Sequence, residues 1–214
     1  MIQHVYEHCV AAQGIERVIV ATEDQRIVKA CHEFGGDVEL TLSSHVSGTD
    51  RVAEVASRHS EYDAVLNVQG DEPAIEPETV SAVAAALADS TVQISSAMTI
   101  FLPHEAPENS NAVKVTIAAN GDALYFSRSL IPYYRDPDAQ DKKFFRHLGI
   151  YGFRREALLK VTQLPPSALE RAESLEQLRW LEAGYRIRCA LVKSHSFGID
   201  TPQDLEILLE NQSH

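Results

Sequence analysis

The sequence predicts a single α/β domain over residues 1–214, with a mostly parallel sheet, helices on both faces and a smaller antiparallel portion. Up to residue 89, apolar segments alternate strictly with helical ones, which implies parallel strands joined by right-handed crossovers. Several apolar runs are nearly continuous, as in strands buried on both faces. Asn120-Gly121 between two apolar runs indicates a hairpin. We therefore place an antiparallel insertion or lid over residues 94–135.

The first part of the chain supplies the alternating elements. A helix up to Ala12 is indicated by apolar residues at helical spacing, and Gly14 ends it. Thr22 and Asp24 cap the next helix, which Gly35-Gly36 terminates. The expected elements after the first helix are a strand over 17–22, a helix to 34, a strand over 38–42, a helix over 52–59, a strand over 64–68 and a helix over 76–89.

The second part contains the antiparallel strands and most of the remaining helices. Pro132 to Lys143 is polar and proline-bearing, which indicates a loop. Thr201 followed by Pro202 is a helix start in the preferred order of cap and proline. The other expected elements are strands over 94–100, 112–118, 123–126, 147–153 and 187–192, and helices over 154–160 and 168–182.

Composition and charge restrict the class of protein. The formal net charge of −12 argues against a surface that binds nucleic acid or an anionic membrane, because such surfaces are basic. Cys9, Cys31 and Cys189 are widely spaced and form no CxxC pair, which is typical of reduced thiols in a cytosolic protein. No apolar run approaches the roughly 20 residues of a membrane helix. We expect a cytoplasmic protein that neither inserts into membranes nor binds nucleic acid.

Carboxylates follow the strand over 64–68 directly. Gln69-Gly70-Asp71-Glu72 stops the strand, and Pro73 forbids further ladder pairing. Ligands of open α/β sheets bind at the carboxyl ends of the strands, and Mg²⁺ prefers carboxylate oxygens. Asp200 also lies between a strand and a helix, so Asp71 and Asp200 together are candidates for one Mg²⁺ site. The alternative is that Asp71 and Glu72 are turn carboxylates and Asp200 neighbours a helix cap.

Two further segments indicate anion binding. Ser47-Gly48-Thr49-Asp50-Arg51 offers hydroxyl groups, a glycine and a guanidinium just before a helix, which fits an anion or nucleotide at a helix N-terminus. A capped turn is the alternative. Positive charge also gathers at Arg128, Arg135, Lys142, Lys143 and Arg146, and arginine is suited to bidentate recognition of a substrate carboxylate. Solvated loop charges are the alternative for Arg135, Lys142 and Lys143.

Polar residues on two later elements complete the candidate set. His147 and Tyr151 lie four residues apart on a strand, so both face the same side of the sheet. Glu176 and Gln177 are adjacent polar residues on an otherwise apolar helix. On spacing alone, the first pair also fits residues at the edge of the core, and the second pair fits a solvent-facing side of the helix.

Taken together and in order, five motifs resemble those of the 3-deoxy-manno-octulosonate (Kdo) cytidylyltransferase family. The resemblance spans essentially the whole chain. The motifs are Asn67-Val68-Gln69-Gly70-Asp71-Glu72-Pro73, Asn111-Ala112-Val113-Lys114-Val115, Ala123-Leu124-Tyr125-Phe126-Ser127-Arg128, His147-Leu148-Gly149-Ile150-Tyr151-Gly152 and Gly198-Ile199-Asp200-Thr201-Pro202.

The resemblance implies a Rossmann-like nucleotide-binding fold and a Mg²⁺-dependent transfer of CMP from CTP to Kdo for lipopolysaccharide synthesis. It implies that Asp71 and Asp200 bind the metal, that residues 47–51 with Gln69 line the nucleotide side, and that the chain forms a homodimer through residues 164–182. It also implies that the sugar acid is surrounded by Arg128, His147, Tyr151, Glu176 and Gln177.

The chain departs from the family pattern at its start. The family begins with a strand and a phosphate-binding loop, whereas Met1-Ile2-Gln3-His4 corresponds to the helix that follows them. We expect the lack of that strand to leave a groove in the core and to put the activity of the chain as given in doubt. Our hypothesis is that the protein is longer than this sequence, in which case its intact mass exceeds 23.7 kDa; the alternative is a truncated, inactive chain. The alternatives are a cytidylyltransferase for another acidic sugar, such as a sialic acid or amino-Kdo, and a non-catalytic homologue.

Overall fold

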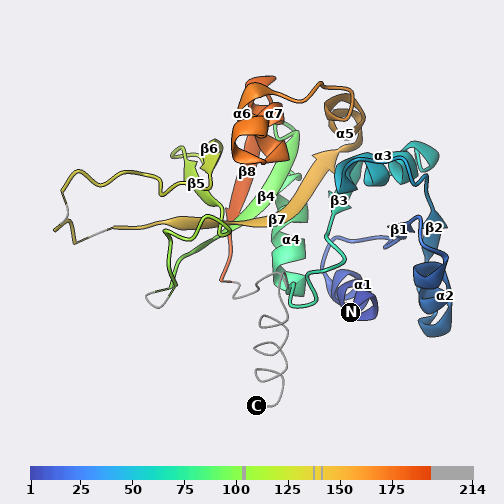
Figure 1. Cartoon of the computed structure of the whole chain (residues 1–214). Coiled ribbons are helices and arrows are strands. Elements are labelled where there is room, and N and C mark those ends of the chain that lie inside the picture. The colour runs from blue at the N-terminus through green and yellow to red at the C-terminus, as the bar shows by residue number, and fades with distance from the viewer. Residues whose placement is uncertain (103–104, 137, 141, 194–214) are drawn as a thin grey trace, which may run out of the picture.

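The computed structural model describes residues 1–102, 105–136, 138–140 and 142–193. Among these residues are a six-stranded mixed sheet, a separate two-stranded parallel sheet and helices around both (Figure 1). The α/β class and helices on both faces are confirmed. Asp200 and the terminal helix expected from Thr201 lie outside the described residues. No helix in these ranges is long and apolar enough to cross a membrane.

The six-stranded sheet is more antiparallel than the sequence predicts. Its strands are β3 (Ala64–Asn67), β4 (Ile94–Ile100), β5 (Lys114–Ile117), β6 (Ala123–Ser127), β7 (Phe145–Arg154) and β8 (Ile187–Leu191). The order is β6-β5-β7-β4-β8, and β3 pairs with β7. Only β4 and β8 pair in parallel; the other pairs in this sheet are antiparallel. The expectation of parallel strands comes from the alternation of strands and helices early in the chain. It fails for this sheet because β7, which comes late in the chain, pairs antiparallel with β3, β4 and β5.

The predicted antiparallel insertion is only partly separate. The hairpin of β5 and β6 turns at Gly121, whose φ of 85° requires glycine. However, β4 is an interior strand of the larger sheet between β7 and β8, and the hairpin continues the same sheet through β7. Residues 94–100 therefore belong to the core of the domain, while a lid function for the hairpin stays a prediction.

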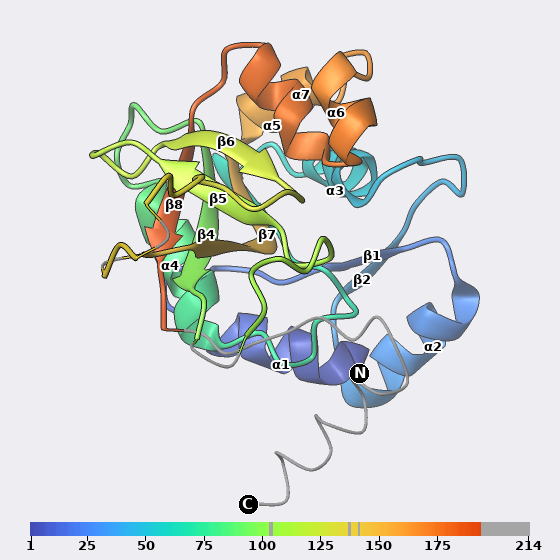
Figure 2. The same cartoon turned by 60° about the vertical axis from the view of Figure 1, so that its left-hand side comes forward.

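The first two strands form their own small sheet. β1 (Val20–Thr22) pairs in parallel with β2 (Val38–Leu40), and α2 (Gln25–Phe34) connects them. Asp24 caps α2 and Gly35 ends it in the left-handed conformation, as predicted. Figure 2 shows this pair and α2 reaching away from the larger sheet. In the described part of the chain, β1 and β3 do not pair with each other, so β3 is an edge strand and not the central, fully buried strand expected from residues 64–68.

Helices cover the two faces of the larger sheet with separate apolar clusters. α3 (Gly48–Arg58), α5 (Arg155–Val161) and α7 (Glu176–Glu182) pack on one face, around Phe153, Leu158 and Trp180. α1 (Ile2–Ala11) and α4 (Pro77–Ala86) pack on the other, around Val83 and Ile150.

The helix predicted over 168–182 is two helices. α6 (Ala168–Glu173) ends at Ser174, whose φ of 51° breaks the helical path before α7 begins. Leu175 and Leu178 are buried in the core of the chain. The leucine face expected to contact a second copy thus packs inward, and only Leu169 of the predicted face is exposed, at 37%.

Candidate active site

The site begins where β3 ends. Asn67 is the last residue of β3, lies opposite Tyr151 of β7 and is 3% exposed. The chain turns at Gln69 and places Asp71 on the surface. An exposed carboxylate at the end of a strand is the arrangement predicted for Asp71, and its partner Asp200 lies outside the described residues.

The segment Ser47–Arg51 is the cap and first turn of α3 and not a turn ahead of a later helix. The hydroxyl of Ser47 accepts a hydrogen bond from the backbone N–H of Asp50 at 3.1 Å. A Cβ on Gly48 would stand 3.4 Å from the Gln69 amide, so the glycine keeps the helix N-terminus open beside that side chain. Two predicted nucleotide-side segments are therefore adjacent in space.

Thr49 connects this helix to the predicted sugar side. Its hydroxyl donates a hydrogen bond to Oε2 of Glu176 at 2.6 Å, across 127 residues of sequence. Arg179 donates to the other oxygen of Glu176 at 2.9 Å. Burial raises the pKa of Glu176, while the hydrogen bond from Thr49 and the charge of Arg179 oppose that shift. Glu176 is thus a largely buried carboxylate and not a residue of the solvent face, and Gln177, at 4% exposed, is buried too.

His147 and Tyr151 lie against each other as predicted, with ring centroids 5.4 Å apart. Both are 8% exposed. Burial lowers the pKa of His147 to about 3, so the imidazole is neutral at physiological pH. Burial also raises the pKa of Tyr151, and the nearby charges of Glu176 and Glu72 add to the effect. Tyr151 therefore lies near Glu176, the carboxylate that accepts the hydrogen bond from Thr49 at the start of α3.

Arg128 follows β6 and is anchored to the junction of α6 and α7. Its Nε donates to the carbonyl of Glu173 at 2.7 Å, and its Nη groups donate to Ser110 and Ser174 carbonyls at 3.1 and 3.3 Å. A guanidinium has five N–H donors, so two remain for a ligand. The side chain is therefore held in one orientation without being saturated.

Arg51 has a structural role in the described residues. Its guanidinium pairs with Glu23 at 2.5 Å and donates to the hydroxyl of Thr41 at 2.6 Å. These contacts tie α3 to the ends of β1 and β2. Arg51 also borders the groove near Gly48. Its guanidinium is already paired with Glu23, so it is less suited to bind a phosphate than the sequence predicts.

Two buried polar residues were not among the predicted site residues. Lys114 of β5 is fully buried, and its ammonium donates to the carbonyls of Asn109, Ala112 and Arg128. Ser96 of β4 is also fully buried, with its hydroxyl 2.8 Å from Nε2 of His147. A lysine inside an otherwise apolar strand is a signal that sequence inspection can detect, whereas a serine in a strand carries no such signal.

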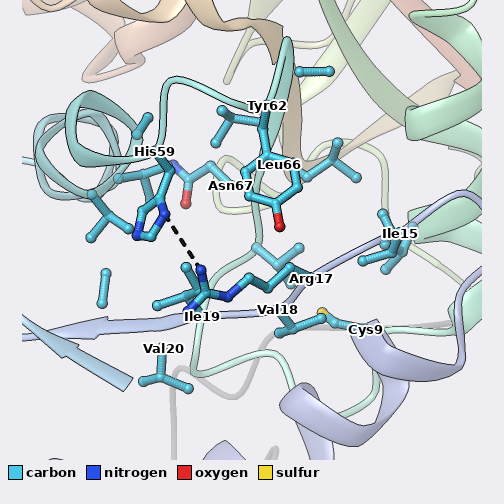
Figure 3. A pocket seen from close by; sticks show the side chains of 18 of the residues that line it. Cys9, Ile15, Arg17, Val18, Ile19, Val20, His59, Tyr62, Leu66 and Asn67 are labelled. Atoms are coloured by element: carbon cyan, nitrogen blue, oxygen red, sulfur yellow. Dashed lines mark hydrogen bonds between the residues drawn. The ribbon is translucent and has the colours of Figure 1, made fainter. Parts of the chain in front are cut away.

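The groove that the sequence predicts lies between β1 and β3. It is a cavity of about 620 Å³ lined mainly by apolar side chains of α1, residues 15–21, α3, residues 64–70 and α4. Figure 3 shows Val18, Ile19 and Val20 on one side and Leu66 on the other, with Arg17 and His59 joined by a hydrogen bond of 3.4 Å. Its lining includes Gly48, Asn67 and Gln69, so the groove adjoins the site.

The described residues fit Mg²⁺ only in part. Among them there is no group of three or more His, Cys, Asp or Glu side chains placed to hold a metal. Mg²⁺ commonly takes one or two protein carboxylates and completes its shell with water and substrate phosphates. The exposed carboxylate of Asp71, next to Glu72, is suited to that kind of site.

Comparison with known proteins identifies the family. The family model described as "Cytidylyltransferase" matches residues 1–187. This chain belongs to the cytidylyltransferase family. A relative from Myxococcus xanthus, named 3-deoxy-manno-octulosonate cytidylyltransferase, is 47% identical over 96% of this chain and 83% of its own. One of the same name from Bacteroides thetaiotaomicron is 45% identical over 100% of this chain and 89% of its own.

A solved structure confirms the fold of this cytidylyltransferase. The structure of CMP:2-keto-3-deoxy-manno-octonic acid synthetase complexed with CTP superimposes with a TM-score of 0.91 at 40% identity, covering 100% of this chain and 88% of the other. The Rossmann-like nucleotidyltransferase fold and the enzyme class predicted from the sequence are thus confirmed.

Proposed function

We propose that this cytidylyltransferase transfers CMP from CTP to Kdo and releases pyrophosphate, giving CMP-Kdo for lipopolysaccharide synthesis. The observation that carries the proposal is the contact of Thr49 with Glu176, at 2.6 Å, which joins the nucleotide-side segment to the sugar-side helix. The names of the relatives and of the CTP-complexed structure support both substrates.

The reaction needs no nucleophilic side chain. The anomeric hydroxyl of the sugar acid attacks the α-phosphorus of CTP, the new P–O bond forms, and the bond from the α-phosphorus to the bridging oxygen breaks. The hydroxyl proton is lost to solvent or to a phosphate oxygen. Catalysis then rests on positioning and on neutralising the negative charge of the phosphates.

On the nucleotide side, the N-terminus of α3 supplies free backbone N–H groups and a positive dipole end to an anionic or polar ligand. Gly48 leaves room for the ligand beside Gln69. The Thr49 hydroxyl is directed to Glu176, so this contact links the nucleotide side to the sugar side and leaves phosphate binding to the backbone N–H groups.

On the sugar side, Arg128 is suited to the carboxylate of the sugar acid. Its guanidinium is fixed by three backbone carbonyls and retains two N–H donors. His147 is neutral and buried, so it can take part only through a hydrogen bond. Glu176 and Gln177 begin α7, directly after the carbonyls of Glu173 and Ser174 that hold Arg128. A carboxylate and an amide at this place can form hydrogen bonds with sugar hydroxyls.

We further propose that Asp71, with Asp200, holds Mg²⁺, which when bound offsets phosphate charge. A homodimer is proposed from the family resemblance, and a cytoplasmic location from the sequence composition. Light scattering on the purified chain tests the dimer, and a mass of one chain would contradict it.

The experiment for the function is pyrophosphate release from CTP with Mg²⁺ and one sugar acid at a time. We expect release with Kdo and at least tenfold less with N-acetylneuraminic acid or amino-Kdo. A preference for either of the other sugars would favour the alternative specificity. Binding of CTP without release with any sugar would favour a non-catalytic homologue. We expect Arg128→Ala to raise the KM for Kdo and the matched control Arg171→Ala, on α6, to leave it unchanged, because within the described residues Arg171 bonds only to the carbonyl of Pro166.

A further inference from the structure

The fully buried hydroxyl of Ser96 lies at the centre of a hydrogen-bond network between β4 and β7. Its Oγ is 2.8 Å from Nε2 of His147, 2.8 Å from the carbonyl oxygen of Ile150 and 3.4 Å from that of Leu148. No charged side chain takes part in these contacts. The arrangement therefore depends on where one hydroxyl proton is placed.

The network coincides with a bulge in β7. Ser96 lies opposite Tyr151, and the next residue of β4, Ala97, lies opposite Leu148, so residues 149–150 are extra on β7. Bulges redirect side chains and are frequent beside active sites. Here the hydroxyl of Ser96 replaces ladder hydrogen bonds at the bulge by reaching the carbonyl of Ile150.

A carbonyl oxygen can only accept a hydrogen bond, whereas a hydroxyl has one proton and two acceptor lone pairs. The proton of Ser96 is therefore used for the carbonyl of Ile150, and the oxygen faces Nε2 of His147 as an acceptor. Nε2 must then carry the proton of the neutral ring. Within the described part of the chain, the ring of His147 makes no other hydrogen bond, so the Nδ1 lone pair has no protein donor; the backbone N–H of His147 donates separately to the carbonyl of Val113.

We propose that Ser96 is a positioning residue that fixes His147 in the Nε2–H tautomer, so that Nδ1 accepts a hydrogen bond from a hydroxyl group of the bound sugar. The ligand class rests on the proposed function. A ring in this state cannot donate through Nδ1, so it selects a hydroxyl and rejects the carboxylate of the substrate. That division leaves the carboxylate to Arg128.

The tautomer is measured in the free protein by long-range ¹H–¹⁵N correlation of the histidine rings at pH 7, with His147→Asn used to assign the signals. We expect the Nε2–H pattern for His147. The Nδ1–H pattern would overturn the proposal. Because no substrate is present, this result is independent of whether Kdo is the substrate, which the pyrophosphate assay decides.

Kinetics then separate positioning from packing. In Ser96→Ala we expect a mixed tautomer and a rise of about three- to tenfold in the KM for Kdo, the size of one hydrogen bond, with an unchanged KM for CTP. Ser96→Thr keeps the hydroxyl and restores both. Ser95→Ala is the matched control, because Ser95 is equally buried and bonds to the carbonyl of Val83 instead.

Two results would overturn the proposal. One is a Ser96→Ala enzyme whose KM for Kdo is unchanged although its tautomer has changed. The other is an equal loss for both substrates in Ser96→Ala and Ser95→Ala, which would indicate a packing effect alone. If Ser96→Ala does not fold, the wild-type spectrum and Ser96→Thr still decide between the tautomers.

Discussion

Removal of the buried Lys114 ammonium tests whether its hydrogen bonds to backbone carbonyls stabilise the fold and hold Arg128 in place. Lys114 is fully buried, and all three of its protons go to backbone carbonyls, of Asn109 at 2.9 Å, of Ala112 at 2.8 Å and of Arg128. Burial lowers its pKa, and the charge of Glu173 partly opposes that shift. Lys114→Met removes the charge and shortens the side chain by only one heavy atom, so the cavity contribution is small.

The magnitude follows from opposing effects. Each hydrogen bond to a charged donor contributes roughly 1.5–3 kcal/mol. The loss of three such bonds is offset by several kcal/mol of desolvation that the ammonium no longer requires. We expect a net decrease of about 2–4 kcal/mol in the free energy of unfolding, together with a raised KM for the sugar acid, because the carbonyl of Arg128 loses its anchor.

The assay is urea unfolding followed by the fluorescence of Trp180, which is fully buried. Lys160→Met is the control, because Lys160 is 68% exposed and forms only a helix-surface pair with Glu156. It should change the free energy of unfolding by less than about 0.5 kcal/mol. If Lys114→Met changed it no more than this control, the reasoning about the buried ammonium would be refuted.

Three further predictions concern pH, metal and packing. Because the pKa of His147 falls from 6.5 to about 3 on folding, the unfolded chain takes up its proton first. The contribution of the neutral His147 ring to the free energy of unfolding is therefore complete above pH 6.5 and is lost as pH falls towards 3. Between pH 7 and 5, the free energy of unfolding of the wild type should fall by about 2 kcal/mol more than that of His147→Asn. Equal decreases would contradict the burial of the ring. Asp71→Asn should leave the melting temperature unchanged and lower kcat by at least 100-fold, with chelation of Mg²⁺ abolishing the wild-type rate; normal turnover would mean that the metal lies elsewhere. Gly152→Ala should lower the free energy of unfolding by about 1–3 kcal/mol, because a Cβ there would lie 2.4 Å from the hydroxyl of Ser95; an unchanged unfolding midpoint would show that the core can relax.

Local signals predicted the elements well and their pairing less well. The caps at Asp24 and Ser47 and the turn at Gly121 depend on neighbouring residues alone, so the sequence indicates them directly. The pairing of β7 with both β3 and β4 depends on contacts across the whole chain. Periodicity also gave no sign of the break at Ser174, because the apolar spacing continues through it.

The candidate site shows the same division. Residue types and the family resemblance pointed to Thr49, His147, Tyr151 and Glu176, and the structure brings them into one region. Whether each side chain is exposed or buried could not be inferred, because burial depends on what packs over it. Ser96 could not be predicted as a site residue for the same reason. Its hydrogen bonds depend on the bulge in the neighbouring strand β7, which the sequence does not indicate.

The most direct test of the central claim is ³¹P NMR of a reaction containing CTP, Kdo, Mg²⁺ and the purified chain. We predict that the three CTP signals are replaced by one phosphodiester signal from CMP-Kdo and by a pyrophosphate signal of twice its intensity, and that both products require Kdo. Unchanged CTP, or pyrophosphate formed without Kdo, would contradict the proposed transfer.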